Sequence, residues 1–178
     1  MRFKKTDFKG LILIFHNVYT DYRGDFKEIL KKNKLEDFLG YNLNFCQANS
    51  VKSNLNVLRG LHFQKEPFAQ SKLISVAHGE ILDIAVDIRK NSKTYGKYFS
   101  RILSARNNES IFIPRGFAHG YLTLTKNAII NYEVDNYYKP EMEDGISYKD
   151  DFLNIDWGIN ESKIIISEKD NNLKYFEW

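Results

Sequence analysis

The sequence predicts a mainly β fold, in which short strands form a barrel or a sandwich with short helices at its periphery. Two observations predict this class. Apolar residues occur in short runs that are rich in β-branched and aromatic side chains, and helical periodicity is scarce. Many short strands at close spacing favour a sandwich or barrel over strands that alternate with helices. The 178 residues contain no visible linker or internal repeat, so we expect one domain over residues 1–178.

The expected strands lie, in chain order, at residues 11–15, 57–63, 73–77, 81–88, 98–103, 110–113, 128–134 and 163–166. Each is a short apolar run of the length of a strand. One short helix is expected at residues 31–39, with the sequence KKNKLEDFL, and a single helical turn at residues 149–153.

Alternation along these strands predicts which side chains share a face. In residues 81–88 the apolar side chains at even positions fall on one side, with Asp83 and Asp87 on the other. In residues 128–134, Tyr132 is in step with the apolar set and should point into the core or into a cavity. A regular strand would place Leu58, Gly60, His62 and Gln64 on one face, whereas a bulge at Gly60 would shift that register. Because a buried histidine and tyrosine need polar partners, we expect a lined cavity there.

Charge and composition narrow the function classes. The 26 basic and 23 acidic side chains give a formal net charge of +3 without a basic block, which gives a nucleic-acid role little support. The apolar run before His16 has only five residues, too few for a signal-peptide core or a membrane span. The single cysteine, Cys46, is expected to be a small buried hydrophobe and suits a reducing compartment. We therefore expect a cytoplasmic protein that contacts neither nucleic acid nor membrane.

A second informative stretch is IPRGFAHGY at residues 113–121. Its Pro-x-Gly-x-x-His matches part of the second motif of cupin barrels, where a turn delivers a histidine into the barrel mouth. Cupins often bind a metal through histidines and a carboxylate. The first cupin motif needs His-x-His, and this chain has His62-Phe63-Gln64 instead, while His16 and His78 lie in unrelated stretches. No bound metal is expected.

A series of ordered motifs spans residues 21–170. In chain order these are D-x-R-G-x-F at 21–26, F-x-Q-x-N at 45–49, L-R-G-L-H-x-Q at 58–64, Q-x-K at 70–72, D-x-R-x-x-S-x-T-Y-G at 87–96, I-P-x-G-F-A-H-G at 113–120, Y-Y-x-P-x-x-E-x-G-I at 137–146 and S-x-K-D at 167–170. With this series the chain resembles the nucleotide-sugar 3,5-epimerases, the family typified by dTDP-4-dehydrorhamnose 3,5-epimerase. The resemblance implies a cupin-type jelly-roll barrel or sandwich, with its barrel core at about residues 40–140.

The resemblance also implies a reaction without a cofactor on a nucleoside diphosphate 4-keto sugar. The C4 carbonyl acidifies the hydrogens on C3 and C5, so inversion needs a base on one face, an acid on the other and a cation near the enolate oxygen. By resemblance His62 is the base and Asp170 the carboxylate that orients it. Tyr132 is the acid that returns the proton from the far side, and Lys72 stabilises the developing negative charge.

Binding positions carry over in the same way. Those implied for the sugar, diphosphate and nucleotide pocket are Gln47, Asn49, Arg59, His119, Tyr138, Glu143 and Lys169. Arg23, Phe26 and Glu28 match a segment that contacts nucleotide bound to the neighbouring subunit. The resemblance therefore implies a homodimer in which this N-terminal segment is exchanged across the interface.

Several alternatives stay open on the sequence. The nucleotide could be dTDP, GDP or another, the sugar a hexose or a heptose, and inversion could occur at C3, at C5 or at both. A nucleotide-sugar 3,4-ketoisomerase uses a related barrel. A non-catalytic ligand-binding cupin is the alternative from a different class.

Overall fold

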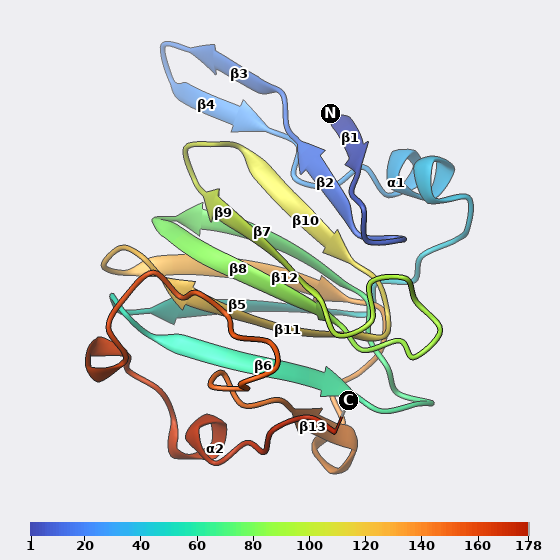
Figure 1. The fold of residues 1–178 in the computed structure, drawn as a ribbon. Helices are drawn as coiled ribbons and strands as arrows, with labels where there is room; N and C mark the ends of the chain where they lie inside the picture. The colour runs from blue at the N-terminus through green and yellow to red at the C-terminus, as the bar shows by residue number, and fades with distance from the viewer. Residues whose placement is uncertain (178) are drawn as a thin grey trace.

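The computed structural model describes residues 1–177 and arranges most strands in two sheets that face each other (Figure 1). The six-stranded sheet has the order β1 (Arg2–Lys5), β2 (Ile12–Phe15), β10 (Glu109–Ile113), β7 (Lys72–His78), β12 (Ala128–Val134) and β5 (Gln47–Ser53). The five-stranded sheet has the order β13 (Glu143–Gly145), β6 (Leu58–Gln64), β11 (Phe117–Thr123), β8 (Glu80–Asp87) and β9 (Tyr98–Ser104). The predicted mainly β sandwich of cupin type is confirmed.

The space between the sheets is the main apolar core. Ile74 and Ile111 of the six-stranded sheet pack there with Ile81 and Leu103 of the five-stranded sheet, and all four are fully buried. At one end of the sandwich polar side chains replace this apolar filling. The interior therefore changes along its length from a packed core to a lined cavity, as expected from the polar residues in step with the apolar ones.

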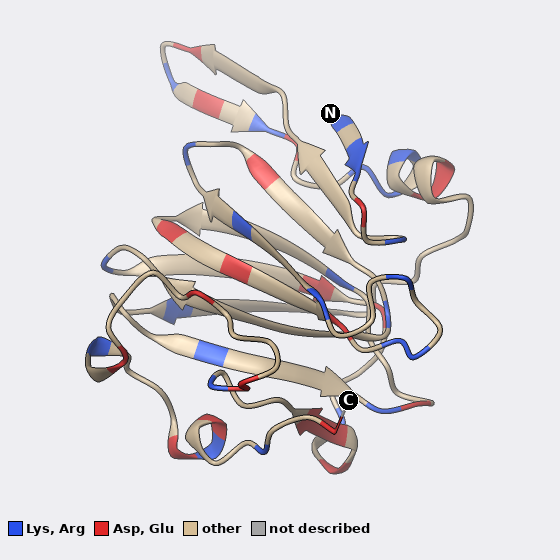
Figure 2. Cartoon of the chain, in the orientation of Figure 1, with Lys and Arg blue, Asp and Glu red and all other residues tan. Residues whose placement is uncertain are grey.

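Both outer faces of the sandwich are covered. Helix α1 (Lys32–Leu39) lies where the sequence predicts it and buries Leu35 against Ile12 and Phe112 of the six-stranded sheet. It ends at Gly40, whose φ of 80° is the left-handed conformation that commonly closes a helix. The C-terminal segment packs its apolar side chains, including Trp157, on the outer face of the five-stranded sheet. Charged residues of both signs are spread over the chain (Figure 2).

Two predictions for this C-terminal segment are wrong. Residues 163–166 form no strand: Lys163 ends a 3-10 helix, η2 (Glu161–Lys163), and Ile165 makes only one isolated bridge to Val57. Residues 149–153 form hydrogen-bonded turns, because the Asp150 carboxylate accepts from two main-chain N–H groups just after it. Both segments cover a finished sheet, so burial of their apolar side chains does not require a continuous ladder.

Strand β6 has the bulge that the sequence left open. The pairing of β6 with β11 shifts register between His119 and Tyr121, opposite Gly60. A Cβ atom on Gly60 would lie 2.6 Å from the main chain of β11, so only glycine permits this approach. The shift breaks the regular alternation and turns Arg59 and His62 toward the same cavity.

The last residue of β8, Asp87, is a buried carboxylate that holds the following loop. Asp87 accepts hydrogen bonds from the Arg89 guanidinium and from the hydroxyls of Ser92 and Thr94, at 2.6–2.7 Å. Burial raises the pKa of this carboxyl, but the bonds from Arg89, Ser92 and Thr94 outweigh burial and hold the pKa below its usual value. Asp87 thereby fastens the loop that follows β8 to the sheet.

Replacing Asp87 by alanine is expected to lower the free energy of unfolding by about 3–5 kcal/mol, because the buried donors lose their acceptor. Urea unfolding at pH 7 measures this, and Asp37→Ala, at an exposed helix position, is the control with little expected effect. The folded pKa of Asp87 is lowered, so its contribution is complete above the unfolded pKa and is lost as the pH falls through the folded one. Equal urea midpoints for wild type and Asp87→Ala at pH 7 would contradict this assignment.

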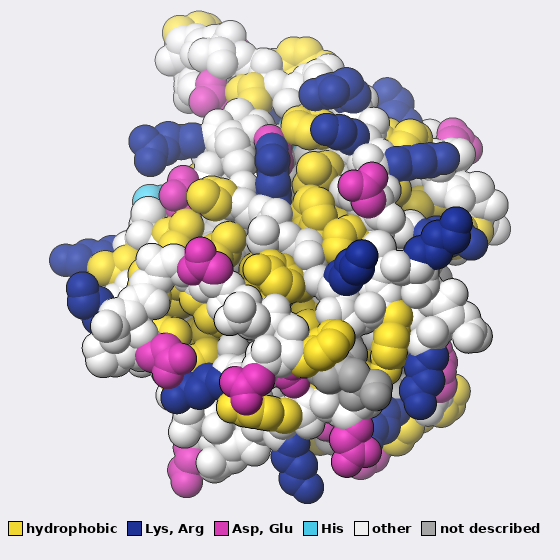
Figure 3. Space-filling model, viewed as in Figure 1, with side chains coloured by type: hydrophobic (Ala, Val, Ile, Leu, Met, Phe, Trp, Pro, Cys, Tyr) yellow, Lys and Arg dark blue, Asp and Glu magenta, His cyan; other side chains and the backbone are white. Residues whose placement is uncertain are grey.

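A hairpin of β3 (Val18–Asp21) and β4 (Gly24–Lys27) pairs with neither sheet and projects from the body (Figures 1 and 3). Tyr19 and Phe26 lie on it with ring centroids 6.3 Å apart, and both residues are more than half exposed.

No helix among residues 1–177 has the length and apolar character needed to cross a membrane.

Candidate active site

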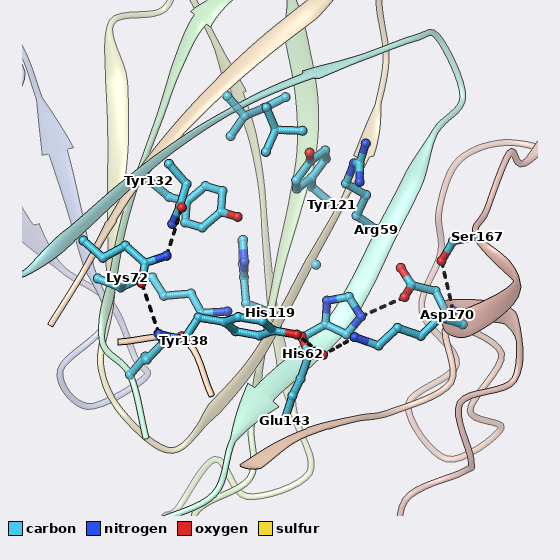
Figure 4. A pocket seen from close by; sticks show the side chains of 18 residues that line it. Arg59, His62, Lys72, His119, Tyr121, Tyr132, Tyr138, Glu143, Ser167 and Asp170 are labelled. Atoms are coloured by element: carbon cyan, nitrogen blue, oxygen red, sulfur yellow. Dashed lines mark hydrogen bonds and ion pairs between the residues drawn. The ribbon is translucent and has the colours of Figure 1, made fainter. Parts of the chain in front are cut away.

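A cavity of about 420 Å³ opens between the two sheets at the polar end of the sandwich. The five-stranded sheet contributes Arg59 and His62 from β6 and His119 from β11, and the six-stranded sheet contributes Lys72 from β7 and Tyr132 from β12. The ladders bring these residues to the same depth, since His119 pairs with His62 and Tyr132 lies in register between Asn49 and Ile74. Figure 4 shows Tyr132 and Lys72 on one side of the cavity and His62 with Asp170 on the other.

His62 and Asp170 form a hydrogen-bonded pair. His62 Nε2 lies 2.9 Å from Asp170 Oδ1, and the other carboxylate oxygen accepts from the main-chain N–H of Gly60 at 3.1 Å. An ionised carboxylate can only accept, so the Nε2 atom carries the hydrogen and Nδ1 is the nitrogen that can take a proton. The pair is thus arranged as a base with its orienting carboxylate.

Asp170 reaches this position from a short C-terminal helix, α2 (Glu168–Asn171). Ser167 caps the helix by accepting from the Asp170 N–H, and the Asp170 side chain is almost fully buried. Burial raises the pKa of Asp170, but the hydrogen bonds from His62, the Gly60 N–H and Ser167 together outweigh burial and lower it. The carboxylate therefore stays ionised at neutral pH.

Tyr132 and Lys72 face this pair from the opposite sheet. Burial raises the pKa of Tyr132, although the nearby Arg59 cation opposes the shift, so the phenol keeps its proton at neutral pH. Burial lowers the pKa of Lys72 to about 8. The nearby carboxylates of Glu143 and Asp83 favour the charged form and oppose this shift. Within residues 1–177 no hydrogen bond or ion pair engages the Lys72 ammonium or the Tyr132 hydroxyl. Both groups are free to meet a bound molecule.

The Lys72 ammonium is expected to make a reaction in this cavity sensitive to alkaline pH. The cation is complete well below pH 8 and is lost as the pH rises through about 8, so kcat/KM is expected to fall as the pH passes that value. In Lys72→Arg the fall should move to higher pH, because a guanidinium stays charged. Lys72→Met should lower kcat/KM by roughly 10²–10³-fold, the loss typical of one group that stabilises an oxyanion. An alkaline limb that stays at pH 8 in Lys72→Arg would assign the limb to another group.

Two further networks line the floor of the cavity. His119 Nε2 lies 2.8 Å from Asp83 Oδ2, and both side chains are buried. Arg59 donates through Nε to Ser53 at 3.2 Å, and Ser53 lies 3.3 Å from the Tyr121 hydroxyl. The terminal nitrogens of Arg59 keep their planar fork available for an anionic group such as a diphosphate.

Three segments meet at the mouth of the cavity. The Tyr138 hydroxyl donates to Glu143 Oε2 at 3.0 Å, and Lys169 forms an ion pair with the same oxygen. Tyr138 follows β12, Glu143 begins β13 and Lys169 belongs to α2. This cluster lies beside His62, so a ligand that enters the cavity passes it (Figure 4).

The structure brings together all of the implied site residues except those of the N-terminal segment. Arg23 is largely exposed and pairs with Asp21 at 2.6 Å, Phe26 is exposed on β4, and Glu28 pairs with Lys31. None of the three lines the cavity of its own chain. The sequence predicts no role for Asp83 or Tyr121. For Asp83 the available signal was a carboxylate within an apolar strand, on the face opposite Leu82 and Ile84.

Residues 1–177 contain no group of three His, Cys, Asp or Glu side chains placed to hold a metal ion. His62 and His119, the two histidines of the cavity, are each bound by one carboxylate, Asp170 or Asp83. The Nε2 atoms of the two rings therefore bind two different carboxylates and do not converge on one point.

Fold and cavity together define a class: a cupin-type sandwich with an acid–base site between its sheets. A family model described as dTDP-4-dehydrorhamnose 3,5-epimerase matches residues 5–177. The dTDP-4-dehydrorhamnose 3,5-epimerase of Escherichia coli is 43% identical over 169 residues, which cover 95% of this chain and 91% of the relative. The chain belongs to the dTDP-4-dehydrorhamnose 3,5-epimerase family, which confirms the resemblance seen in the motifs, and it is an isomerase.

Solved structures agree. The crystal structure of dTDP-4-dehydrorhamnose 3,5-epimerase from Elizabethkingia anophelis superposes with a TM-score of 0.94 at 44% identity, covering 99% of this chain and 96% of that one. A dTDP-6-deoxy-D-glucose-3,5-epimerase from Legionella pneumophila, in complex with dTDP-4-keto-L-rhamnose, gives a TM-score of 0.93 at 40% identity, covering 98% and 92%.

Proposed function

We propose that this protein inverts C3 and C5 of a dTDP-linked 4-keto-6-deoxy sugar, converting dTDP-4-dehydro-6-deoxyglucose into dTDP-4-dehydrorhamnose. One observation carries the proposal. His62, held by Asp170 of α2, and the protonated Tyr132 come from two facing sheets, with a cavity between them. Inversion at carbon needs a base and an acid on opposite faces of the sugar ring, and this arrangement supplies both.

The first step is proton abstraction. His62, held by Asp170, removes the hydrogen next to the ketone, and its electron pair moves into the carbonyl to give an enolate. Lys72, a cation in a buried site, lies near the enolate oxygen and stabilises its charge. Removal at C5 follows the same course, because the ketone at C4 acidifies both neighbours.

The second step returns a proton from the other side. The Tyr132 hydroxyl donates to the carbon of the enolate, the ketone at C4 reforms and the configuration at that carbon is inverted. Arg59 and Lys169 suit the diphosphate, since a cavity with these cations favours an anionic group. His119, held by Asp83, suits a hydrogen bond to the sugar.

Incubation with dTDP-4-dehydro-6-deoxyglucose in D₂O tests the proposal. The expected result is deuterium at both C3 and C5, with the ketone still at C4 and a product of inverted configuration. Deuterium at one carbon alone would narrow the activity to a single epimerisation. Movement of the ketone to C3 would indicate a ketoisomerase, and no exchange with dTDP-, GDP- or UDP-linked 4-keto sugars would leave the non-catalytic ligand-binding reading.

We also infer a homodimer in which each β3–β4 hairpin lies against the second copy. A two-stranded hairpin is marginally stable alone, and this one exposes Tyr19, Tyr22 and Phe26. A second copy would bury these rings and would bring Arg23 and Phe26 to the neighbouring cavity. Neither Arg23 nor Phe26 lines the cavity of its own chain, which supports the exchange.

Mixed dimers test this exchange. Arg23→Ala and His62→Ala variants are co-expressed with different affinity tags, and the mixed species is purified. An exchanged hairpin pairs the intact His62 with the intact Arg23 at one site, so the mixed dimer should recover about half of the wild-type activity. A hairpin that serves its own cavity would leave both sites of the mixed dimer defective.

A further inference from the structure

The segment that carries Tyr138 to the cavity mouth has no regular secondary structure. Strand β12 ends at Val134, and η1 begins at Pro140, so residues 137–139 belong to neither a strand nor a helix. Main-chain N–H and C=O groups outside regular structure still need hydrogen-bond partners. The partners found here determine where Tyr138 lies.

Three glutamine side chains bind the main chain of four consecutive residues, 136–139. We call Gln47, Gln64 and Gln70 the glutamine cradle. The bonds run from Gln70 Nε2 to Asn136 O at 2.7 Å, from Gln64 Nε2 to Tyr137 O at 3.2 Å, from Tyr138 N to Gln47 Oε1 at 3.1 Å and from Lys139 N to Gln64 Oε1 at 2.6 Å. The cradle thus replaces a strand partner for this segment.

Gln64 is the central member of the cradle. It lies on β6 two residues after His62, its side chain is buried, and its Nε2 atom also donates to Phe68 O at 2.7 Å. The amide thus donates to two carbonyl oxygens and accepts from one N–H. A carboxylate has no hydrogen to donate and would place an oxygen against both carbonyls. The position therefore demands an amide, although Gln64 is absent from the cavity wall.

We propose that Gln64 is a positioning residue that fixes Tyr138 at the mouth of the cavity, and this inference rests on the epimerase function proposed above. Tyr138 is 45% exposed, and its hydroxyl interacts with Glu143 and with Lys169, which pairs with the same carboxylate oxygen. Its ring points toward His62 (Figure 4). Because the side chain is so exposed, it depends on its main chain for a defined position.

The physical consequence is a loss of substrate binding rather than of proton transfer. Without the cradle the segment is mobile, and the substrate must order it on binding, which costs affinity. His62 itself stays in place, because β6 is paired with β11 and β13 on either side and Asp170 holds the ring. Gln64 therefore acts on the reaction through Tyr138.

Steady-state kinetics on full-length Gln64→Met and Gln64→Glu test this role. Each variant should raise KM for dTDP-4-dehydro-6-deoxyglucose roughly tenfold, the factor that the net loss of a buried hydrogen bond gives, with kcat changed less than about threefold. In a Tyr138→Ala background the same substitutions should raise KM no further, because residues that act through one another are not additive. Asn107→Ala, which breaks similar side-chain to main-chain bonds at the β9–β10 turn, is the matched control and should leave KM unchanged.

Amide hydrogen exchange gives a second measurement that does not depend on activity. The N–H groups of Tyr138 and Lys139 should exchange faster in Gln64→Met than in wild type, with the β12 amides unchanged. Full additivity with Tyr138→Ala, a fall in kcat at constant KM, or unchanged exchange at residues 138–139 in a folded variant would overturn the proposal. If wild type turns over no 4-keto nucleotide sugar, the epimerase function fails, and the exchange result alone decides whether Gln64 holds the segment.

Discussion

His62→Ala should abolish deuterium incorporation at both C3 and C5, with a loss of kcat/KM of about 10⁴-fold, the upper range for removal of a general base. The reason is positional: the ionised Asp170 holds Nε2 of His62, which leaves Nδ1 of the same ring to take the proton, and His62 faces Tyr132 across the cavity. Nuclear magnetic resonance of the sugar in D₂O measures the exchange directly. Surviving exchange at either carbon would show that another group acts as a base there.

Two further variants separate chemistry from folding. In His62→Ala the buried Asp170 loses one hydrogen-bond partner, so some stability is lost with the activity. His62→Gln keeps an amide that can donate to this carboxylate but cannot accept a proton from carbon, so it should be folded and inactive. His78→Ala, at the exposed end of β7, is the matched control and should retain full activity.

Tyr132→Phe should separate proton removal from inversion. His62 and Lys72 remain, so solvent deuterium should still enter the sugar. The deuterium should add on the face from which His62 removed the proton, and the configuration should therefore be retained. Formation of the inverted product should fall by roughly 10²–10³-fold, within the range for loss of a general acid. Parallel measurement of deuterium wash-in and of inverted product gives the two rates.

The fold should tolerate this substitution. No described protein group bonds the Tyr132 hydroxyl, so its removal leaves no buried partner unpaired. Tyr41→Phe, a half-exposed tyrosine outside the cavity, controls for loss of a hydroxyl. Normal inversion by Tyr132→Phe would assign the acid to another residue, and Tyr121 is the next phenol in the cavity.

Strands with an apolar stripe were predictable, and strands without one were not. The runs at 73–77, 81–88 and 128–134 became β7, β8 and β12 with shifts of one residue or less at each end. Strand β5, QANSVKS, was missed because its inward residues Gln47 and Asn49 face a polar cavity, so the strand lacks an apolar stripe. The hairpin β3–β4 was missed because it buries no face in its own chain.

The candidate site divides in a similar way. The ordered motifs contain His62 and Asp170, and alternation placed Tyr132 toward the core or a cavity. Alternation set Asp83 on the face of β8 opposite Leu82 and Ile84 without showing which face is the inner one, and its contact with His119 depends on how β8 pairs with β11. Gln64 and Gln70 bind the segment 136–139, which begins 66 positions after Gln70, so no local sequence pattern predicts these contacts.

The sequence by itself determined the class of fold, the strands with an apolar face and the residue types of an acid–base site. Those features follow from local periodicity and from motifs, which are properties of neighbouring residues. Only the tertiary structure decided which polar groups meet, such as His62 and Asp170 across 108 positions, or the glutamine cradle around residues 136–139. These contacts depend on strand register, on the bulge at Gly60 and on the packing of the C-terminal segment. Each of the three is set by residues far apart in the chain, so a local sequence pattern does not predict it.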